Sequence, residues 1–289
     1  MRYLIINADD FGVCTATNEA IEQIFNEGIL SSATIMTPCP GAKDAIARAK
    51  ANPKINIGLH ITTNAEWTRE WGQWKPISSH DKVRSLTDES GYFYSTVREF
   101  AQNAKPSEVA TEMEAQYQYL VNAGIIPTHA DSHMGSLYGL SGTSFMKEAL
   151  EFCAKHKLPF RFPKNIDNVK ALMRMEAIPA PLIAGHKQAV AYAAALGVKL
   201  IDNLLTSTVD FAELTGYEKL KAIYFHLISS LPEGVSEIFM HPSLENSPVG
   251  ANNPKWPARV WEYQLLRDDS FRKHIEREGI ALITYTEIR

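Results

Sequence analysis

The sequence predicts an α/β fold, a single closed or nearly closed (β/α) barrel of about seven parallel strands. Three observations predict it. Short apolar segments alternate with longer segments of helical periodicity along all 289 residues. No linker rich in Pro, Ser or Gly divides the chain, so we expect one domain over residues 1–289. Ionisable residues follow most of the apolar segments, and parallel strands of a barrel bring their carboxyl ends to one face.

The expected strands are the apolar segments, of which there are eight, so that the barrel would hold seven or eight strands. They are residues 3–6, 33–36, 55–59, 127–130, 158–162, 198–201, 237–240 and 281–285. Each is short and bounded by polar or turn-forming residues, as is typical of strands buried in a parallel sheet.

Helices are expected between these segments, where start and stop signals of helices occur. Residues 18–26 are followed by Gly28, and Pro106 opens a helix that Gly124 closes. Residues 144–156 place apolar side chains on one helical face. Residues 256–278, with Pro257 near the start, form the longest expected helix.

Two stretches lack a clear periodicity, a rim insertion at about 62–105 and a second irregular segment at about 163–197, which is partly helical. Long loops of compact domains are usually functional or disordered, and the aromatic content of the first stretch argues against disorder. Trp67, Trp71 and Trp74 recur at spacings of four and three. They indicate either a short amphipathic helix on the barrel or a stacking wall for sugar rings, so we expect pocket walls here.

The composition is that of an ordinary globular protein, with 45% hydrophobic and 21% charged residues. It excludes a disordered chain, a collagen-like repeat and a coiled coil. Lys and Arg number 29 against 33 Asp and Glu, a formal net charge of −4. No basic surplus points to nucleic acid or an anionic membrane as a partner.

Cysteine usage and the N-terminal sequence bear on the compartment. The three widely spaced cysteines indicate neither a disulfide framework nor a cysteine zinc site. The first residues lack the features of a secretory signal, and no window approaches the roughly 18 apolar residues of a membrane span. We therefore expect a cytoplasmic protein that does not enter a membrane.

Candidate site residues come from the ends of six expected strands. They are Asp9 and Asp10, His60, the group His129, Asp131 and His133, then Arg161, Asp202 and His241. Because carboxyl ends of parallel strands open on one face of a barrel, we expect these side chains to converge there.

The adjacent carboxylates Asp9 and Asp10 are ordinarily a solvated turn or a helix cap. At the end of a buried strand they also suit a division of labour, in which one ligates a metal and the other acts as a general base. His60 and the two histidines around Asp131 could be structural. Together with an aspartate they also form a set of two imidazoles and one carboxylate, which is typical of catalytic metal sites.

His241 could protonate a leaving group or cap its strand, and the sequence leaves both roles open. No dinucleotide-binding GxGxxG, phosphate-binding P-loop or GxSxG nucleophile motif is present. Covalent catalysis and dinucleotide chemistry are therefore not supported.

Four motifs in this order resemble the YdjC-like carbohydrate deacetylases, the family of chitooligosaccharide deacetylase and the hopanoid-associated deacetylases. The motifs are Asn7-Ala8-Asp9-Asp10-Phe11-Gly12, Gly58-Leu59-His60, Thr128-His129-Ala130-Asp131-Ser132-His133 and Met240-His241-Pro242. The likeness spans nearly the whole chain. More remotely the sequence resembles the polysaccharide deacetylases, which have a distorted (β/α) barrel and an Asp-His-His metal site.

The resemblance implies a metal site with Asp10 as the carboxylate ligand and His60 and His133 as the imidazole ligands. It implies that Asp9 is the general base that deprotonates the metal-bound water, and that His241 assists departure of the amine.

Further residues would support this site. By the same resemblance His129 and Asp131 lie behind the ligands, and Arg161 orients the aspartate or binds substrate. Trp74 is expected to lie beside the substrate. Where family members commonly continue after the second histidine ligand with His-His-x-His, this chain continues Met134-Gly135-Ser136-Leu137-Tyr138-Gly139.

The implied activity is hydrolysis of an N-acetyl group from an amino sugar or oligosaccharide, with one divalent cation, Mg²⁺ or Zn²⁺, as cofactor. The partner is then a small acetylated sugar. From the sequence alone, Trp261 and Tyr263 could pack between the subunits of a homo-oligomer or in the core. Two alternatives remain open: a metal-dependent sugar isomerase or phosphoesterase on a similar barrel, and a sugar-binding relative without activity.

Overall fold

The computed structural model describes residues 1–66, 73–209, 213–247, 250, 253 and 255–288. Within them, parallel strands form a nearly closed barrel in the order β6-β5-β4-β3-β2-β1-β8-β7, and β9 pairs with β1. The strands are β1 (Arg2–Phe11), β2 (Ser32–Ile35), β3 (Ile57–Ile61), β4 (Ala130–Ser132), β5 (Phe160–Pro163), β6 (Leu200–Ile201), β7 (Asn203–Leu205), β8 (Gly234–Met240) and β9 (Ala281–Leu282).

The expected barrel is confirmed, and each of the eight expected segments contains or overlaps a strand. The sequence did not predict β7. A single residue, Asp202, separates it from β6. The Asp202 carboxylate accepts a hydrogen bond from the backbone N–H of Val235 at 2.8 Å and pairs with Lys164 at 2.9 Å. These two contacts hold Asp202 in place, so that two short strands, β6 and β7, form on either side of it in place of one longer strand.

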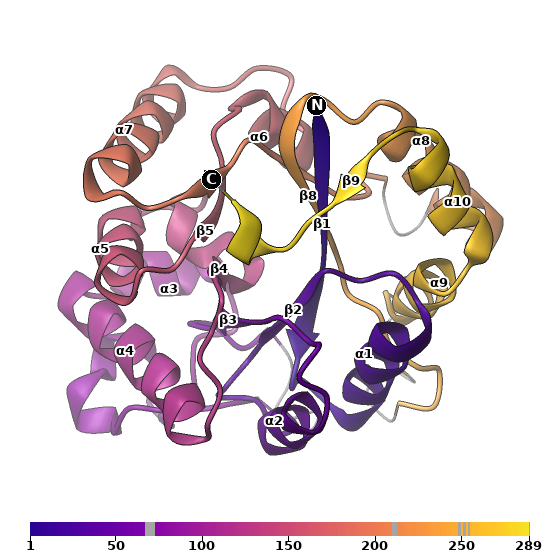
Figure 1. Cartoon of the computed structure of the whole chain (residues 1–289). Coiled ribbons are helices and arrows are strands. Elements are labelled where there is room, and N and C mark those ends of the chain that lie inside the picture. The colour runs from indigo at the N-terminus through magenta and orange to yellow at the C-terminus, as the bar shows by residue number, and fades with distance from the viewer. Residues whose placement is uncertain (67–72, 210–212, 248–249, 251–252, 254, 289) are drawn as a thin grey trace.

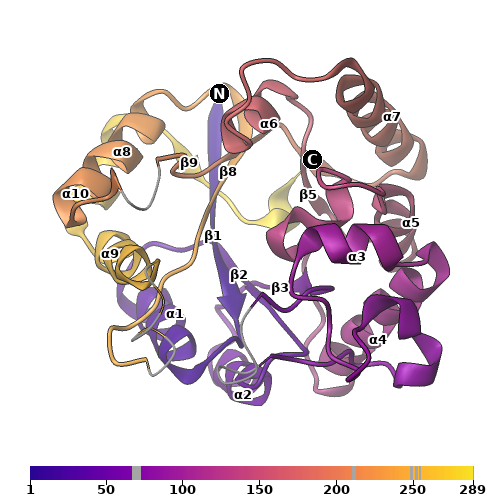
Figure 2. The ribbon, with the colours of Figure 1, turned by 180° about the vertical axis from the view of Figure 1, so that it is seen from behind.

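Helices surround the strands, as both views of the ribbon show (Figure 1, Figure 2). They are α1 (Thr15–Glu27), α2 (Ala42–Ala51), α3 (Val97–Asn103), α4 (Pro106–Asn122), α5 (Met146–His156), α6 (Asp167–Leu172), α7 (Ala180–Leu196), α8 (Tyr217–Ser229), α9 (Trp256–Leu266) and α10 (Asp269–Arg277). None of the helices described here combines the length and apolar character that crossing a bilayer requires.

The core lies where these helices cover the strands. Strand β1 shows this most clearly, because it has β2 on one side and β8 on the other. Its residues Leu4, Ile5 and Ile6 are fully buried. A strand covered on both faces reads as a continuous apolar run, which is why the sequence pattern locates it.

The expectation of one long helix over 256–278 is wrong, because the segment forms α9 and α10. The side chain of Asp268 accepts a hydrogen bond from the backbone N–H of Ser270 at 2.7 Å and caps the start of α10. Tyr217 and Lys221 of α8 also bind this carboxylate. The longest described helices are α4 and α7, with 17 residues each.

Helix α4 binds described parts of the segment 62–105 on both sides of its gap at 67–72. Buried Glu112 accepts hydrogen bonds from the backbone N–H groups of Ile77 and Ser78, each at 2.9 Å. One turn further, Gln116 accepts from the backbone N–H of Thr62 at 3.0 Å.

The aromatic stretch of this segment is only partly described. Trp67 and Trp71 lie outside the described residues, so the expected tryptophan wall is represented by Trp74 alone. The second irregular stretch, residues 163–197, contains α6 and α7.

Candidate active site

The two adjacent carboxylates of β1 reach the same pocket because the strand is bulged. Between Ala8 and Phe11 the register with β2 shifts, so that Asp9 and Asp10 together oppose Thr34. Asp10 has a positive φ of 62°, a conformation that aspartate tolerates better than most residues. In a regular strand neighbouring side chains point to opposite faces, whereas a bulge redirects one of them.

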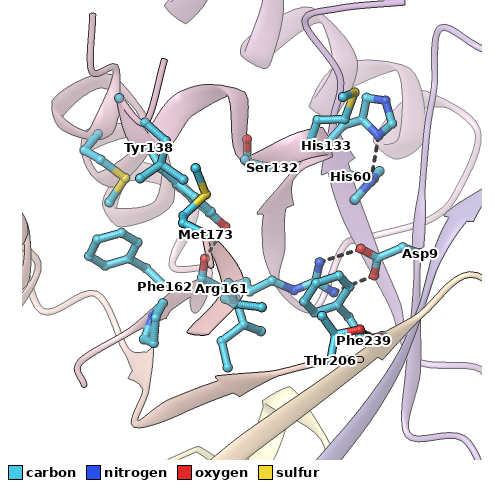
Figure 3. A pocket seen from close by; sticks show the side chains of 18 of the residues that line it. Asp9, His60, Ser132, His133, Tyr138, Arg161, Phe162, Met173, Thr206 and Phe239 are labelled. Carbon is cyan, nitrogen blue, oxygen red and sulfur yellow. Dashed lines mark hydrogen bonds and ion pairs between the residues drawn. The ribbon is translucent and has the colours of Figure 1, made fainter. Parts of the chain in front are cut away.

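Asp10, His60 and His133 converge inside this pocket, and their candidate ligand atoms all lie within 4.8 Å of one another. Asp10 Oδ1 lies 3.5 Å from His60 Nε2 and 3.5 Å from His133 Nδ1. The two ring nitrogens are 3.3 Å apart, and Figure 3 shows both rings at one end of the pocket. All three residues are buried.

The carboxylate of Asp131 orients the ring of His60 through the ring nitrogen that does not face Asp10. Asp131 Oδ1 lies 2.6 Å from His60 Nδ1, so Nδ1 donates and the lone pair of Nε2 faces Asp10 and His133. Burial opposes protonation of His60, but the charge of Asp131 and the nearby Asp10 carboxylate outweigh it and raise its pKa to about 10. The surroundings therefore favour a positive charge at this point.

The ring of His133 is oriented in the same manner by Glu66, whose Oε2 lies 2.8 Å from Nε2. The remaining nitrogen, Nδ1, then directs its lone pair to Asp10 and His60. Burial opposes protonation here too, and the Glu66 and Asp10 carboxylates raise the pKa of His133 to about 9. Trp74 packs edge-on against this ring at a centroid distance of 6.3 Å.

Asp9 belongs to a separate network centred on Arg161 of β5. Arg161 donates to both Asp9 oxygens, at 2.6 and 2.7 Å. The same guanidinium pairs with Asp131 at 2.9 Å and with Glu237 at 2.6 Å. Burial of Glu237 outweighs the nearby charge of Arg161 and raises the pKa of that carboxyl to about 7. Asn7 donates a further hydrogen bond to Asp9 Oδ1 at 2.8 Å.

Helix α9 supplies two residues to the other side of the pocket. Arg259 Nη2 donates to Asp10 Oδ2 at 2.7 Å. Burial opposes ionisation of Asp10, yet the charge of Arg259 and the two histidines hold its pKa well below the usual range. Glu262 accepts a hydrogen bond from the backbone N–H of His241 at 2.7 Å and so fixes the chain at the end of β8.

These groups line one cavity of about 1200 Å³. Strands β1, β3, β5 and β8 and the loop after β4 contribute Asp9, Asp10, His60, Arg161, His133 and His241 to its wall. The predicted convergence at the carboxyl ends of the strands is therefore confirmed for five of the six expected strands.

Asp202 is the exception, and the expectation that it reaches this rim is wrong. It lies against the backbone at the start of β8, at the opposite end of that strand from His241. Three other predicted residues are buried outside the cavity lining, namely His129, Asp131 and Trp74, and Asp131 lies behind His60. The ring of His129 stacks on Tyr285 at 3.9 Å, and Trp74 donates its indole N–H to the backbone of Asn64.

Sequence reasoning missed Glu66, Arg259, Glu262 and Glu237. Glu66 lies in a segment with no periodicity, so nothing marked it. Arg259 and Glu262 are three residues apart on α9, on the face that also buries Ala258 and Leu265. The available signal was that charged residues lie on an otherwise apolar helix face. The argument from strand ends does not consider helix faces, so it missed both residues.

The three converging residues fit a divalent cation. Asp10 Oδ1 is buried and has no hydrogen-bond partner, which is costly for a carboxylate oxygen unless another positive group approaches it. Two imidazole nitrogens and one carboxylate oxygen are the donor set of many catalytic zinc sites. Asp9, His60 and Asp131 also lie within 4.8 Å of one another, but Arg161 already pairs with both of those carboxylates.

The chain is similar over nearly its whole length to known proteins. Residues 3–277 match the model of the family described as YdjC-like protein. A carbohydrate deacetylase of Thermoanaerobacter pseudethanolicus is 28% identical over 289 residues, which cover 100% of both chains. One of Geobacillus stearothermophilus is 26% identical over 287 residues, 99% of this chain and 98% of that protein.

A similar solved structure is that of a putative cellobiose-phosphate cleavage protein from Enterococcus faecalis V583. It has a TM-score of 0.77 and 27% sequence identity, and the match covers 98% of this chain and 97% of the other.

Proposed function

Because this chain belongs to the YdjC-like family, we propose that it is a metal-dependent hydrolase that removes an N-acetyl group from an amino sugar or oligosaccharide. The observation that carries the proposal is the convergence of Asp10, His60 and His133 around a buried, unpartnered carboxylate oxygen. The relatives named carbohydrate deacetylase support the same reaction.

In this proposal Asp10, His60 and His133 hold one divalent cation, Zn²⁺ or Mg²⁺. When bound, the cation supplies a Lewis acid that lowers the pKa of water and polarises the acetyl carbonyl. Asp131 and Glu66 keep the two rings in the tautomers that leave a nitrogen lone pair for the metal. Arg259 neutralises the Asp10 oxygen that faces away from the two rings.

Asp9 is the general base of the proposal. Its Oδ1 accepts hydrogen bonds from both Asn7 and Arg161, whereas Oδ2 accepts one, from Arg161. Oδ2 therefore has the more accessible lone pair and takes the proton of the attacking water. Arg161 holds this carboxylate in one orientation throughout.

His241 lines the same cavity and donates a proton to the departing amine. Its backbone is fixed by Glu262, and its ring packs edge-on against Phe239 at 5.8 Å. His129 takes no direct part, because it is buried behind β3. Of the described residues in segment 62–105, Glu66 lines the pocket, and the chain acts as one barrel unit.

Release of acetate tests this function. Metal-stripped protein is incubated with N-acetylglucosamine oligomers with and without added Zn²⁺ or Mg²⁺, and acetate and free amine are measured. We expect acetate and amine in equal amounts, only when metal is present. Interconversion of sugar isomers without acetate would favour an isomerase, and sugar binding without turnover under either metal would favour a binding protein.

A further inference from the structure

Arg161 is held along two edges of its guanidinium. The end of the group, Nη1 and Nη2, donates to Asp9, as Figure 3 shows. The side of the group faces Glu237 of β8, whose Oε1 accepts from Nε at 2.7 Å and lies 2.6 Å from Nη2. A guanidinium is planar and rigid. Contacts along a second edge therefore fix the direction in which Arg161 presents its first edge to Asp9.

The second oxygen of Glu237 is held in turn by the C-terminal part of the chain. The hydroxyl of Tyr285 donates to Glu237 Oε2. Each oxygen of this carboxylate therefore has a partner, Arg161 on one and Tyr285 on the other. Two side chains, Glu237 and Arg161, connect Tyr285 to the proposed base.

Glu237 and Tyr285 lie inside the barrel and outside the cavity. Glu237 is fully buried and Tyr285 is 1% exposed. Glu237 is in register with Ile5 of β1 and Leu204 of β7, and these two residues pack in one buried cluster with Tyr285. Neither Glu237 nor Tyr285 lines the cavity, so neither can touch a substrate bound there.

The segment around Tyr285 is fixed to the rest of the barrel. The ring of Tyr285 stacks on His129, with centroids 3.9 Å apart and planes 7° from parallel. The backbone N–H of Ile283 donates to the carbonyl of Leu4 in β1 at 2.9 Å. A capping box begins the 3₁₀ helix Tyr285–Glu287. Figure 1 shows this segment, in yellow, running from β9 toward the middle of the ring of helices. The hydroxyl is therefore presented from a fixed backbone.

Stability alone does not explain a carboxylate at position 237. An ion pair in a protein interior loses about as much hydration as it gains in attraction, so a well-packed apolar residue would stabilise the barrel as well. Arg161 also pairs with the carboxylates of Asp9 and Asp131, so its charge is compensated without Glu237. What Glu237 adds is a second direction of hydrogen bonding to Arg161.

We propose that Glu237 and Tyr285 are positioning residues. They fix Arg161 from the interior of the barrel, and Arg161 holds the Asp9 carboxylate in the orientation that accepts a proton. The catalytic part of this inference rests on the proposed function, in which Asp9 is the base. The positioning part rests on the contacts alone.

Tyr285→Phe is the most selective test, because it removes one oxygen and keeps the ring on His129. Acetate release from N-acetylglucosamine oligomers is measured on the Zn²⁺-loaded protein. Misplacing a catalytic group by about 1 Å can cost about 100-fold in rate, so we expect kcat to fall by about tenfold or more. KM should not change, because Tyr285 makes no contact in the cavity. The affinity for Zn²⁺, measured by competition with a chelator, should also be kept.

Tyr217→Phe is the matched control. The hydroxyl of Tyr217 in α8 also donates to a carboxylate, that of Asp268 at 2.6 Å, and neither residue lines the cavity. We expect this variant to keep the kcat of the unmodified protein.

Variants of Glu237 separate the direction of the contacts from their charge. Glu237→Gln keeps an acceptor for Arg161 Nε and an amide that can donate to the Tyr285 oxygen. Only the charge-assisted part of these hydrogen bonds is lost, so we expect kcat to fall by about threefold or less. Glu237→Leu keeps a similar volume without either contact and should lower kcat at least as far as Tyr285→Phe does. If Glu237→Leu does not fold, Tyr285→Phe decides the question.

Combination with Asp9→Asn shows whether the effect passes through the base. The asparagine cannot accept the proton, so the residual rate no longer depends on how this side chain is oriented. Residues that act through one another are not additive, so in the Asp9→Asn background we expect Tyr285→Phe to lower kcat by less than about twofold. An equal fold loss in both backgrounds overturns the inference, because Tyr285 would then act on the fold as a whole.

The outcomes keep the two proposals apart. An unchanged kcat in Tyr285→Phe, with acetate released by the unmodified protein, overturns the positioning inference and leaves the hydrolase intact. A loss of Zn²⁺ affinity as large as the loss of kcat overturns it as well. If the unmodified protein releases no acetate, the hydrolase is overturned, and crystal structures of the unmodified protein and Tyr285→Phe decide the positioning. An Asp9 carboxylate displaced from Arg161 in the variant supports it, and an unmoved carboxylate overturns it.

Discussion

Arg161 donates two parallel hydrogen bonds to Asp9, from Nη1 to Oδ2 at 2.7 Å and from Nη2 to Oδ1 at 2.6 Å. Such bidentate pairing fixes the plane of a carboxylate as well as its position. The guanidinium also pairs with Asp131 and Glu237. Neutralising Asp9 therefore leaves Arg161 with two carboxylate partners, and the buried charge stays compensated.

The Asp9→Asn variant is expected to fold, to keep its metal and to lose turnover by about 10²–10⁴-fold, the usual contribution of a general base. The amide keeps the size of the side chain but cannot take a proton. Acetate release and metal content by elemental analysis, measured on the same preparation, check this. A near-normal rate would show that another group accepts the proton.

The His133→Ala variant is expected to lose both metal and activity, because it removes one of three converging ligands. Zn²⁺ stabilises only the folded protein that binds it, so the rise of Tm on adding Zn²⁺ should disappear. His80→Ala, which changes an exposed histidine, is the control and should keep the full rise. Retention of that rise in His133→Ala would remove His133 from the ligand set.

Glu66→Ala is expected to weaken Zn²⁺ binding by about 10–100-fold, the typical effect of removing a carboxylate that orients a ligating histidine. Competition with a chelator measures this. Glu66→Gln retains an acceptor for His133 Nε2 and should have a smaller effect. Glu89→Ala removes an exposed carboxylate elsewhere in the chain and controls for net charge. Unchanged affinity in Glu66→Ala would mean that the ring holds its orientation without this contact.

Gly58→Ala is expected to lower the free energy of unfolding by about 1–3 kcal/mol through overpacking. A Cβ at this position would lie 2.5 Å from the ring of His129. That ring cannot retreat, because it stacks on Tyr285. The control is Gly185→Ala in α7, where a Cβ meets nothing within 4 Å and helix propensity favours alanine by up to about 1 kcal/mol. Urea unfolding of both variants should give changes of opposite sign.

Glu114→Gln is expected to reduce the acid sensitivity of the fold. Burial opposes ionisation of Glu114, but hydrogen bonds from Lys155 and His156 outweigh it and lower its pKa to about 2. Because the folded pKa lies below the unfolded value, the contribution of this carboxylate is complete above about pH 4.5 and is lost as the pH falls toward 2. The loss of stability between pH 6 and pH 3, measured by urea unfolding, should be smaller in the variant. An equal loss would show that the contact contributes nothing.

The positions of eight strands along the chain could be predicted because strands buried on both faces are apolar throughout, and their ends are marked by polar residues. Asp10, His60 and His133 were among the candidates found in this manner, and their choice as the ligand set came from the family resemblance. The same argument fails for Asp202. An acidic residue that follows a strand and bonds to neighbouring backbone cannot be distinguished, from sequence alone, from one that faces a pocket. The argument fails for His129 because a histidine one residue before a strand can turn inward and pack on a glycine, here Gly58.

The residues that sequence reasoning missed act through contacts that have no local pattern. Glu66 meets His133 across 67 residues of chain, and Arg259 meets Asp10 across 249. The break between α9 and α10 depends on the cap at Asp268, which the helical periodicity over 256–278 conceals.

The bulge in β1 has an evolutionary consequence. Only the one extra residue at this point lets two successive carboxylates face inward, so a single-residue deletion there would turn one of them to the outside. The proposed ligand and the proposed base are therefore linked by backbone geometry, and a descendant that loses the bulge can keep only one of the two acids in the pocket.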